Sequence, residues 1–417
     1  MIRKIKQLFY FPIAYYFRFF AQIKLARWNP KIIVITGSSG KTTLLHLIES
    51  QLGNKAKYSH LANSSYGIPF DILRLTRKKL TPNEWISLFL LAPFKAFGSA
   101  PKEKLYVVEA DCDRPGEGKF LASLLNPEIT LWINSSLTHS VNFDYLVKNG
   151  NFKSPEEAIA NEFGYFLKYT KKLAIVNGDS TLIQGQLKRT RAIIEKVCIK
   201  GLKSYEISNN RTAFIFEDKK YSMNFVVPKN VSCSIQMTIL LLKILNFPLD
   251  TTFKNLILPP GRNTIFKGIK NTTIIDSTYN ATPDGVKTIL EMFDKLPAEK
   301  KWLVLGDMIE LGKKEKEEHE KLARLINSMN LSKVILIGPR VSKYTVPKLK
   351  INTINFLLPN QGLDYILKNL NGGEVILFKG ARFLEGIIEH LLQNKNDITK
   401  LVRRETVWQN RRRSFGL

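Results

Sequence analysis

An apolar run that leads through a glycine-containing loop into an amphipathic stretch constrains the fold of this chain more than any other feature. The run is Ile32–Thr36, and the amphipathic stretch is Thr42–Leu52. Between them, glycines allow the backbone to curl so that successive N–H groups face an anion, and the start of a helix adds positive potential. The sequence therefore predicts a strand, a phosphate-binding loop and a helix, in that order. The loop residues are Gly37, Ser38, Ser39, Gly40, Lys41, Thr42 and Thr43.

Two side chains of this loop have the chemistry to act on a bound nucleotide. The ammonium group of Lys41 is expected to reach the outer phosphates, and the hydroxyl of Thr42 is expected to bind Mg²⁺. The full phosphate-loop pattern has a further glycine at the position of Ile35, so this loop is a shortened variant. An ordinary turn between a strand and a helix is the alternative, and the flanking elements favour the phosphate loop.

The rest of the chain alternates short β-branched runs with longer amphipathic stretches, which is typical of a parallel sheet with helices on both faces. The first series of expected strands is 32–36, 105–109, 129–134 and 173–177, with helices over 42–52 and 155–168. The second series of expected strands is 273–277, 302–305, 333–337 and 375–378, with helices over 286–296 and 316–328.

A turn-rich junction, Leu258-Pro259-Pro260-Gly261, separates the two series and is expected to be the main domain boundary. We therefore expect a basic, aromatic N-terminal segment over residues 1–30, a central phosphate-loop domain over 31–258, and a C-terminal domain with a basic tail over 259–417. The expected fold class is α/β, with a mostly parallel sheet in the central domain and a Rossmann-like C-terminal domain.

Composition limits the class of partner. The 417 residues include 63 Lys and Arg against 36 Asp and Glu, which gives a formal net charge of +27. Such an excess suits nucleic acid, an anionic membrane surface or phosphorylated substrates, and composition does not choose among them. Few aromatics interleave with the basic C-terminal residues Arg403, Arg404 and 411–413, so we expect a solvated tail rather than a nucleic-acid arm.

The first thirty residues contain an apolar and aromatic stretch, Leu8–Phe20, flanked by basic residues. Pro12 and Arg18 interrupt it, and it is shorter than the ~20 residues of a membrane span. No small-x-small cleavage site follows, so the stretch is expected to stay attached. Two placements stay open: an interfacial helix that brings residues 1–28 to a membrane, and a helix packed against the body of the protein.

Cysteine usage indicates the compartment. Cys112, Cys198 and Cys233 are widely spaced and form no C-x-x-C pair, which argues against a disulfide framework and a cysteine-based zinc site. A reducing compartment is therefore expected, either the cytoplasm or the inner face of the membrane.

A carboxylate and an imidazole follow two of the predicted strands. Glu109 ends the strand 105–109, and His139 lies in the loop after 129–134. The carboxyl ends of parallel strands meet at one edge of the sheet, beside the phosphate loop. Both residues are therefore candidates for a Mg²⁺ site, although each signal is weak when taken singly.

Several segments together resemble the Mur ligase family, in its MurF branch, over residues 31 to 385. In order along the chain they are residues 36–43 (TGSSGKTT), 63–69 (NSSYGIP), 133–139 (INSSLTH), 177–179 (NGD), 261–262 (GR), 276–283 (DSTYNATP), 305–312 (LGDMIELG) and 379–382 (KGAR). Glu109 lies where that family has its metal-site glutamate, and His139 falls on the family's histidine.

The resemblance implies an ATP-dependent ligase of cell-wall precursor synthesis that uses Mg²⁺. Such an enzyme activates a carboxylate as an acyl phosphate and joins it to the amine of an amino acid or dipeptide. The implied catalytic residues are Lys41, Glu109 and His139, and the implied metal ligands are Thr42, Glu109 and His139. Nucleotide contacts are implied for the phosphate loop and for Arg262, Asp276, Tyr279 and Asn280. Substrate contacts are implied for Asn63, Ser64, Ser65, Lys379 and Arg382.

Four departures from the MurF pattern stand out. Only thirty residues precede the strand that leads into the phosphate loop, where MurF enzymes have a UDP-sugar-binding domain. The family's carbamylated lysine should lie just before Glu162, and no lysine is there, so Glu162 or Asp111 is the nearest candidate to supply that charge. The segment that carries a His and an Asn near the adenine in the family reads Asn230-Val231-Ser232-Cys233-Ser234 here, without a histidine, which puts the base contacts in doubt. Ser277 and Thr282 replace an Asp and an Asn.

These departures leave three readings open. The first is a MurF-like ligase that acts on ATP, a carboxylate-bearing precursor and an amine donor. The second is a ligase for a lipid-linked or other non-UDP precursor at the membrane. The third is a nucleotide-binding scaffold without turnover. Nucleic-acid binding is suggested only by the charge and is not favoured. The acceptor, the donor and the oligomeric state stay open.

Overall fold

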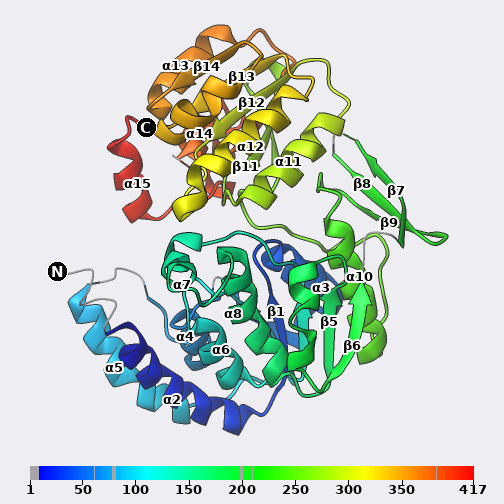
Figure 1. The fold of residues 1–417 in the computed structure, drawn as a ribbon, viewed down its shortest axis with the longest axis vertical. Helices are drawn as coiled ribbons and strands as arrows, with labels where there is room; N and C mark the ends of the chain where they lie inside the picture. Colours follow the sequence, from blue (N-terminus) through cyan, green and yellow to red (C-terminus); the bar gives the residue numbers. More distant parts are fainter. Residues whose placement is uncertain (1–8, 61, 78–80, 198–200, 209, 382) are drawn as a thin grey trace. The chain divides into compact units, whose positions relative to one another are not determined.

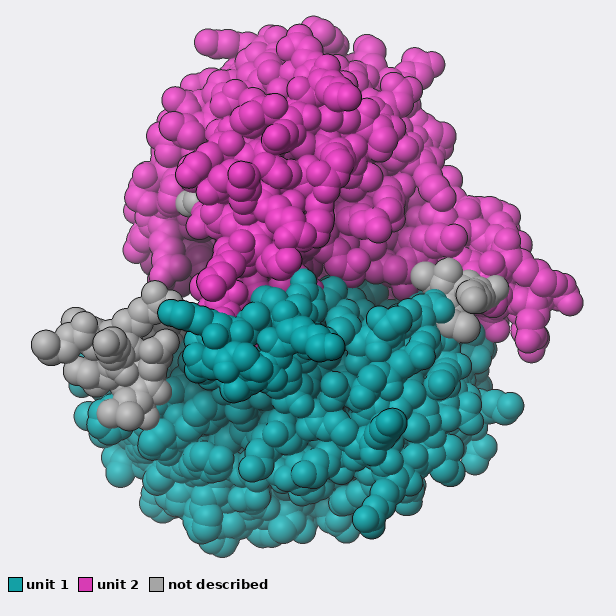
Figure 2. All heavy atoms as spheres, in the orientation of Figure 1, with its two compact units in different colours: residues 1–136, 145–198, 233–249 teal, residues 137–144, 199–232, 250–417 magenta. Residues whose placement is uncertain are grey.

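The computed structural model describes residues 9–60, 62–77, 81–197, 201–208, 210–381 and 383–417. The chain forms two compact units, coloured separately in Figure 2. The first unit comprises residues up to 136, 145–198 and 233–249, and the second comprises 137–144, 199–232 and 250–417. The three-part division expected from the sequence stays a prediction.

The first unit is built on a parallel sheet in the order β2-β3-β1-β4-β5-β6 (Figure 1). Its strands are β1 (Lys31–Thr36), β2 (Ala56–Tyr58), β3 (Leu105–Ala110), β4 (Ile129–Trp132), β5 (Leu173–Asn177) and β6 (Ile193–Val197). Its helices are α2 (Tyr10–Trp28), α3 (Lys41–Leu52), α4 (Gly67–Leu73), α5 (Pro82–Phe97), α6 (Glu117–Leu125), α8 (Pro155–Tyr169) and α9 (Thr181–Gln184). Two further helices, α7 (Asp144–Lys148) and α10 (Val231–Leu245), begin in the second unit and continue in the first.

Alternation along the strands directs side chains to two buried faces. Ile33 and Ile35 of β1 share one cluster with Leu44 of α3 and Met237 of α10. On the other face, the ring of Trp132 lies 6.2 Å from that of Phe163 on α8. Burial on both faces explains why these strands read as continuous apolar runs in the sequence.

The second unit contains a mixed sheet in the order β10-β11-β15-β12-β13-β14, in which β10 alone runs antiparallel to its neighbour. Its strands are β10 (Thr264–Gly268), β11 (Thr272–Ser277), β12 (Lys301–Gly306), β13 (Lys333–Ile337), β14 (Thr353–Phe356) and β15 (Val375–Lys379). Its helices are α11 (Pro283–Lys295), α12 (Glu315–Asn327), α13 (Pro359–Asn369), α14 (Leu384–Leu391) and α15 (Thr406–Arg413). Separate clusters on the two faces pack α11 and α12 on one side and α13 and α14 on the other. The α/β fold class is thereby confirmed.

A small antiparallel sheet was not anticipated. It consists of β7 (Leu202–Ile207), β8 (Thr212–Phe216) and β9 (Lys219–Met223), in that order. Its strands are short and partly exposed, so they lack the long apolar runs that mark the parallel sheets.

The N-terminal helix α2 packs against the body of the first unit. Ala14, Phe17 and Ala21 are fully buried, and α2 contacts both α4 and α5. Pro12 lies in the first turn, where a missing N–H costs no helical hydrogen bond. The ammonium of Lys24 donates to the carbonyl groups at the end of α5, at 2.9 Å from Lys95 and Gly98. The described part of the N-terminal segment is therefore a helix packed against the body of the protein, which is one of the two placements left open by the sequence.

The expectation of a solvated basic tail was wrong for Arg403, Arg404 and Arg412, whereas Arg411 and Arg413 are exposed. Arg412 on α15 is buried, and its guanidinium lies 3.8 Å from Glu385 of α14. Arg403 pairs with the same carboxylate at 3.3 Å, and Arg404 pairs with Glu389. Carboxylates on α14 thus hold Arg403, Arg404 and Arg412 within the second unit. Counting charges along the sequence does not reveal such partners.

Candidate functional site

The phosphate loop follows β1, whose neighbours in the sheet are β3 and β4. This is the point where strand order reverses, and ligands of open α/β sheets bind at such points. Gly37 has φ +134° and Gly40 has φ +80°, and a Cβ at Gly37 would lie 2.7 Å from the carbonyl oxygen of Asn134. The two glycines are therefore required by the backbone, as the motif predicted.

Lys41 is buried at the start of α3. Its Nζ lies 2.8 Å from Asp111 Oδ2 and donates to the carbonyl oxygen of Gly37 at 2.6 Å. Burial by itself lowers the pKa of Lys41, but the carboxylates of Asp111 and Glu109 outweigh it and hold the pKa above its usual value. The two carboxylates thus favour the ammonium form of Lys41. Asp111 is its main counter-ion, a role that the sequence did not assign.

Thr42 and Glu109, two of the predicted metal ligands, contact each other directly. The hydroxyl of Thr42 donates to Glu109 Oε2 at 2.8 Å and to Oε1 at 3.0 Å. Glu109 reaches this position because β3 pairs with β1 in a register that sets Glu109 beside Ile35. Hydroxyl and carboxylate oxygens are the donors that Mg²⁺ prefers, so this pair fits a magnesium ion.

Asn134 supports the loop from the end of β4 and was missed as a site residue. Its Nδ2 donates to Ser39 Oγ at 2.6 Å, and its Oδ1 accepts from the Ser39 N–H at 3.0 Å. Ser38 donates to the carbonyl oxygen of Ser136 at 2.8 Å. Asn134 lies in the segment 133–139, from which only His139 was predicted as a site residue.

The predicted substrate segment, Asn63 to Ser65, lies beside this centre. The carbonyl oxygen of Asn63 accepts from the Asp111 N–H at 2.8 Å. Ser64 Oγ accepts from the Gly67 N–H at 3.1 Å, and the buried Ser65 hydroxyl donates to Glu117 at 3.0 Å. Ser64 and Ser65 thus hold the segment in place, and their substrate contacts stay a prediction.

His139 belongs to the second unit. Its Nδ1 donates to Glu310 Oε2 at 2.6 Å, and this hydrogen bond lowers the pKa of Glu310. The partner lies in the segment 305–312, which the sequence singled out without assigning Glu310. A shared metal for His139 and Glu109 stays a prediction.

The predicted nucleotide contacts of the second unit gather around the carboxyl end of β11, with Arg262 coming from the segment before β10. The guanidinium of Arg262 lies over the ring of Tyr279, 4.2 Å from its centroid, and that ring is 43% exposed. Asp276 is fully buried, and its Oδ2 has no hydrogen-bond partner in the structure. Burial raises the pKa of Asp276, although hydrogen bonds from Thr278 act in the opposite direction. The four predicted residues thus lie together and offer a stacking face and an acceptor.

Lys379, at the end of β15, joins this cluster. Its Nζ donates to the carbonyl oxygen of Asn280 at 2.6 Å. Burial and the charge of Arg262 lower the pKa of Lys379 to about 7, although Asp276 acts in the opposite direction. An added anion would therefore favour the ammonium form. Arg382, also predicted to contact substrate, lies outside the described residues.

Asp307 supports the loop after β12. Its Oδ1 accepts from the N–H groups of Arg340 and Val341, each at 3.0 Å. The carboxylate is completely buried. Asp307 therefore shapes the segment 305–312, which presents Glu310 to His139.

Two family matches cover most of the chain. The Mur ligase middle domain matches residues 35–240, and the glutamate ligase domain of Mur ligases matches residues 261–382. The chain belongs to the Mur ligase family.

Relatives of this Mur ligase bear the name of the branch that the motifs resemble. The UDP-N-acetylmuramoyl-tripeptide–D-alanyl-D-alanine ligase of Rickettsia prowazekii is 26% identical and aligns with 84% of this chain and 75% of its own length. The ligase of that name from Borreliella burgdorferi is 27% identical over 87% and 74%. The MurF ligase of Thermotoga maritima in complex with ADP has the same fold, with a TM-score of 0.73 at 22% identity over 93% of this chain and 84% of that one. The expected MurF resemblance and ligase class are confirmed.

Within this Mur ligase, the acids proposed to replace the missing lysine are not surface groups. Asp111 is engaged with Lys41, and Glu162 on α8 is 6% exposed and accepts from the Gly118 N–H at 2.9 Å. Burial raises the pKa of Glu162 against the hydrogen bonds from Gly116 and Gly118. Glu162 caps α6, so Asp111 is the stronger candidate to supply charge near the phosphate loop.

Activity of this Mur ligase is expected not to respond to bicarbonate. Ala158, Ile159 and Ala160 are buried where the family's lysine should lie, and a carbamate needs an unprotonated lysine. We would measure turnover after removing dissolved CO₂ and again after restoring it. Reversible rescue by bicarbonate would mean that another lysine, such as Lys153, takes this role, and a Lys153→Gln variant would then lose the rescue.

Proposed function

We propose that this chain is a MurF-like ligase that uses ATP and Mg²⁺ to join a carboxylate of a cell-wall precursor to the amine of an amino acid or dipeptide. The observation that carries this proposal is the pair of contacts Lys41–Asp111 and Thr42–Glu109 at the end of β1. Family membership and the names of the relatives support it.

The reaction requires two transfers. A carboxylate oxygen of the precursor attacks the γ-phosphorus of ATP, which releases ADP and leaves an acyl phosphate. The amine then attacks the acyl carbon, forms the amide, and releases phosphate and a proton. Positioning and charge neutralisation dominate such phosphoryl transfers.

The residues divide this work by their chemistry. Lys41 would neutralise the transferred phosphoryl, and the loop N–H groups would bind the β-phosphate. Thr42 and Glu109 would hold Mg²⁺, which when bound supplies further positive charge to the phosphate oxygens. Tyr279 and Arg262 would offer the nucleotide a face for stacking.

Acceptor-dependent ADP release tests this function. The panel would contain a UDP-linked muramoyl tripeptide with D-alanyl-D-alanine and a lipid-linked counterpart with the same donor. ADP release that needs both acceptor and donor supports a ligase, and the preferred acceptor decides between the first two readings. ATP binding without acceptor-dependent release in every combination would instead support a scaffold.

A surface formed by α2 and α5 favours the second reading, a ligase that works at the cytoplasmic face of a membrane. Leu88, Ala92 and Ala96 of α5 are buried. The opposite face of α5 exposes large apolar side chains, and α2, which contacts α5 (Figure 1), has two exposed aromatic side chains of its own. These surface residues are Ile86, Leu90, Leu91, Phe94, Phe97, Tyr15 and Phe19. Phe94 is 76% exposed, so the protein itself covers little of this side chain.

Basic side chains around this α2–α5 surface favour an anionic bilayer as its partner. Arg27 lies over the ring of Phe97, 5.9 Å from its centroid, and Arg77 lies over Trp85 at 5.8 Å. Phe97 is exposed whereas Trp85 is half-buried, so Arg27 beside Phe97 is the basic side chain that suits the headgroup region of an anionic membrane. Among the described residues, no helix is both long and apolar enough to cross a membrane. Contact by the α2–α5 surface is therefore proposed to be peripheral.

The variant Leu90→Ser/Phe94→Ser is expected to bind anionic vesicles at least about tenfold more weakly, because each apolar side chain contributes ~1.5–3 kcal/mol when buried. Co-sedimentation with phosphatidylglycerol vesicles measures this binding. The matched control is Ile257→Ser, which alters a 75% exposed side chain elsewhere. Binding unchanged in the double variant would overturn the membrane proposal, and dimerisation lost in that variant would assign the surface to a second copy of the chain.

A further inference from the structure

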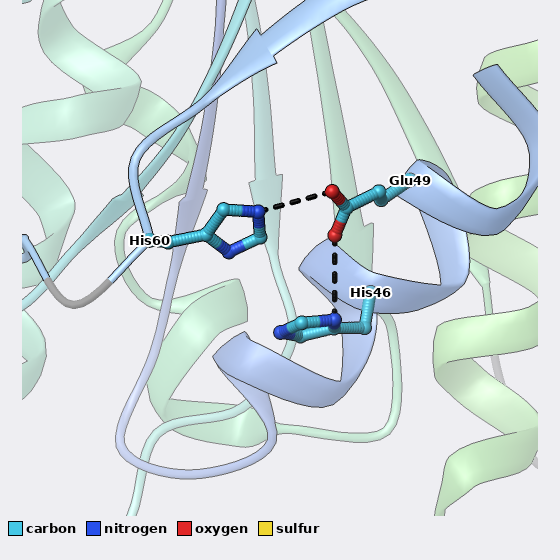
Figure 3. Close-up of side chains that lie close together, drawn as sticks. All are labelled: His46, Glu49 and His60. Atoms are coloured by element: carbon cyan, nitrogen blue, oxygen red, sulfur yellow. Dashed lines mark hydrogen bonds and ion pairs between the residues drawn. The ribbon is translucent and has the colours of Figure 1, made fainter. Parts of the chain in front are cut away.

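A second cluster of ligand-type side chains lies on α3, beyond Lys41 and Thr42. His46 and Glu49 are three residues apart on this helix, so they share one face. His60 follows β2 and points toward the same carboxylate (Figure 3). Glu49 Oε2 lies 3.3 Å from His46 Nδ1, and Oε1 lies 3.0 Å from His60 Nε2. All three ligand atoms lie within 4.8 Å of one another.

The geometry points to a site for a zinc-type divalent transition-metal cation at His46, Glu49 and His60. Two imidazoles and one carboxylate form a donor set typical of zinc and related metals, whereas Mg²⁺ prefers oxygen ligands. Ligands of a tetrahedral zinc ion with bonds of ~2.0–2.1 Å stand about 3.3 Å apart. The nitrogen–oxygen distances of 3.0 and 3.3 Å are close to this spacing.

Neighbouring residues hold His60 in place. The ring of Tyr58 lies 5.9 Å from that of His60, and its hydroxyl donates to the carbonyl oxygen of Gly53 at 2.8 Å. The Ser59 N–H donates to the Val107 carbonyl oxygen at 3.1 Å. The imidazole is therefore carried by a segment bound to β3, which lowers the ordering cost of binding a metal.

Only three protein ligands converge among the described residues, so a water or an outside ligand would complete a tetrahedral site. The side chains are accessible to solvent, with exposures of 15% for His46, 31% for Glu49 and 44% for His60. A cation there would join the helix of the phosphate loop to the segment before Asn63. This inference does not rest on the proposed function, because it needs no nucleotide or turnover.

Hydrogen bonds alone are the competing explanation, since Glu49 can accept from both imidazoles without a metal. The sequence contains five histidines, and two of them meet at this carboxylate. Hydrogen bonding and metal binding predict different responses to added metal, and a direct titration separates them.

The test is a titration of the full chain with Zn²⁺ and Co²⁺ after treatment with a chelator. One equivalent of Zn²⁺ is expected to bind in competition with a chromophoric chelator, and Co²⁺ is expected to give visible absorption of low-coordinate cobalt. His46→Ala and His60→Ala should each weaken Zn²⁺ binding by at least about tenfold, and Glu49→Gln should weaken it as well, because each removes a ligand. Zn²⁺ should also raise the melting temperature of the parent more than that of these variants.

The matched control is His390→Gln, which removes an exposed histidine of α14. It should bind Zn²⁺ as the parent does. The inference is overturned if the parent binds no Zn²⁺ in competition with the chelator, or if the double variant His46→Ala/His60→Ala binds it as tightly as the parent. ADP release without added Zn²⁺ is measured in parallel, so that failure of the zinc-site inference can be told apart from failure of the ligase proposal.

Discussion

Lys41→Ala is expected to lower acceptor-dependent ADP release by ~10²-fold or more, because it removes the cation proposed to meet the transferred phosphoryl. It also leaves Asp111, which is 9% exposed, without its counter-ion. Breaking a buried ion pair costs about 3–5 kcal/mol, so this variant is expected to melt at a lower temperature than the parent. Initial rates and thermal melts of the same samples measure both effects.

A double variant separates catalysis from stability. Lys41→Ala/Asp111→Asn removes both charges of the pair, so it should recover much of the lost stability while ADP release stays low. Near-parental turnover in either folded variant would contradict the phosphate-loop assignment. If turnover recovers together with stability in the double variant, Lys41 affects turnover only by stabilising the fold.

The parallel sheets and the phosphate loop could be predicted because their signals are local. Ile33 and Ile35 belong to a strand buried on both faces, so the run is apolar without a break. Gly37 and Gly40 adopt backbone conformations that favour glycine, which explains why the loop can be recognised from its amino-acid sequence. Glu109 could be placed because a strand register carries its side chain to Thr42.

Other features depend on partners far along the chain. Asp111 became the counter-ion of Lys41 through the pairing of β3 with β1, and no spacing in the sequence marks it. Arg412 is buried because Glu385 lies opposite, so a basic run was mistaken for a solvated tail. The carboxylate facing His139 comes from Glu310, a partner that only tertiary structure supplies.

The N-terminal helix α2 carries both buried and exposed aromatic side chains. Phe17 packs in the interior of the first unit, while Tyr15 and Phe19 remain exposed on the same helix. A helix rich in aromatics on every side gives no periodicity that would separate these faces. The exposed stripe of α5, which extends this surface, lies more than fifty residues later in the sequence.

Glu109→Gln is expected to raise the Mg²⁺ concentration that half-saturates ADP release by about tenfold or more, with a lower rate at saturation. The amide keeps the size of the side chain but loses the charge that attracts a hard cation. Thr42 can still donate a hydrogen bond to the amide oxygen, so the loop should keep its position. His139→Ala should shift the Mg²⁺ dependence in the same direction if the imidazole serves the same metal region.

Glu162→Gln is the matched control, because this buried acid caps α6 through the Gly118 N–H. It should leave the Mg²⁺ dependence unchanged, and the amide oxygen can still accept from the Gly118 N–H. Magnesium titrations of parent, Glu109→Gln, His139→Ala and Glu162→Gln form one experiment. If Glu109→Gln follows the parent curve, Glu109 is not a metal ligand. If only His139→Ala follows it, His139 instead acts by positioning the segment that holds Glu310, and the ion near the phosphate loop is bound from the first unit alone.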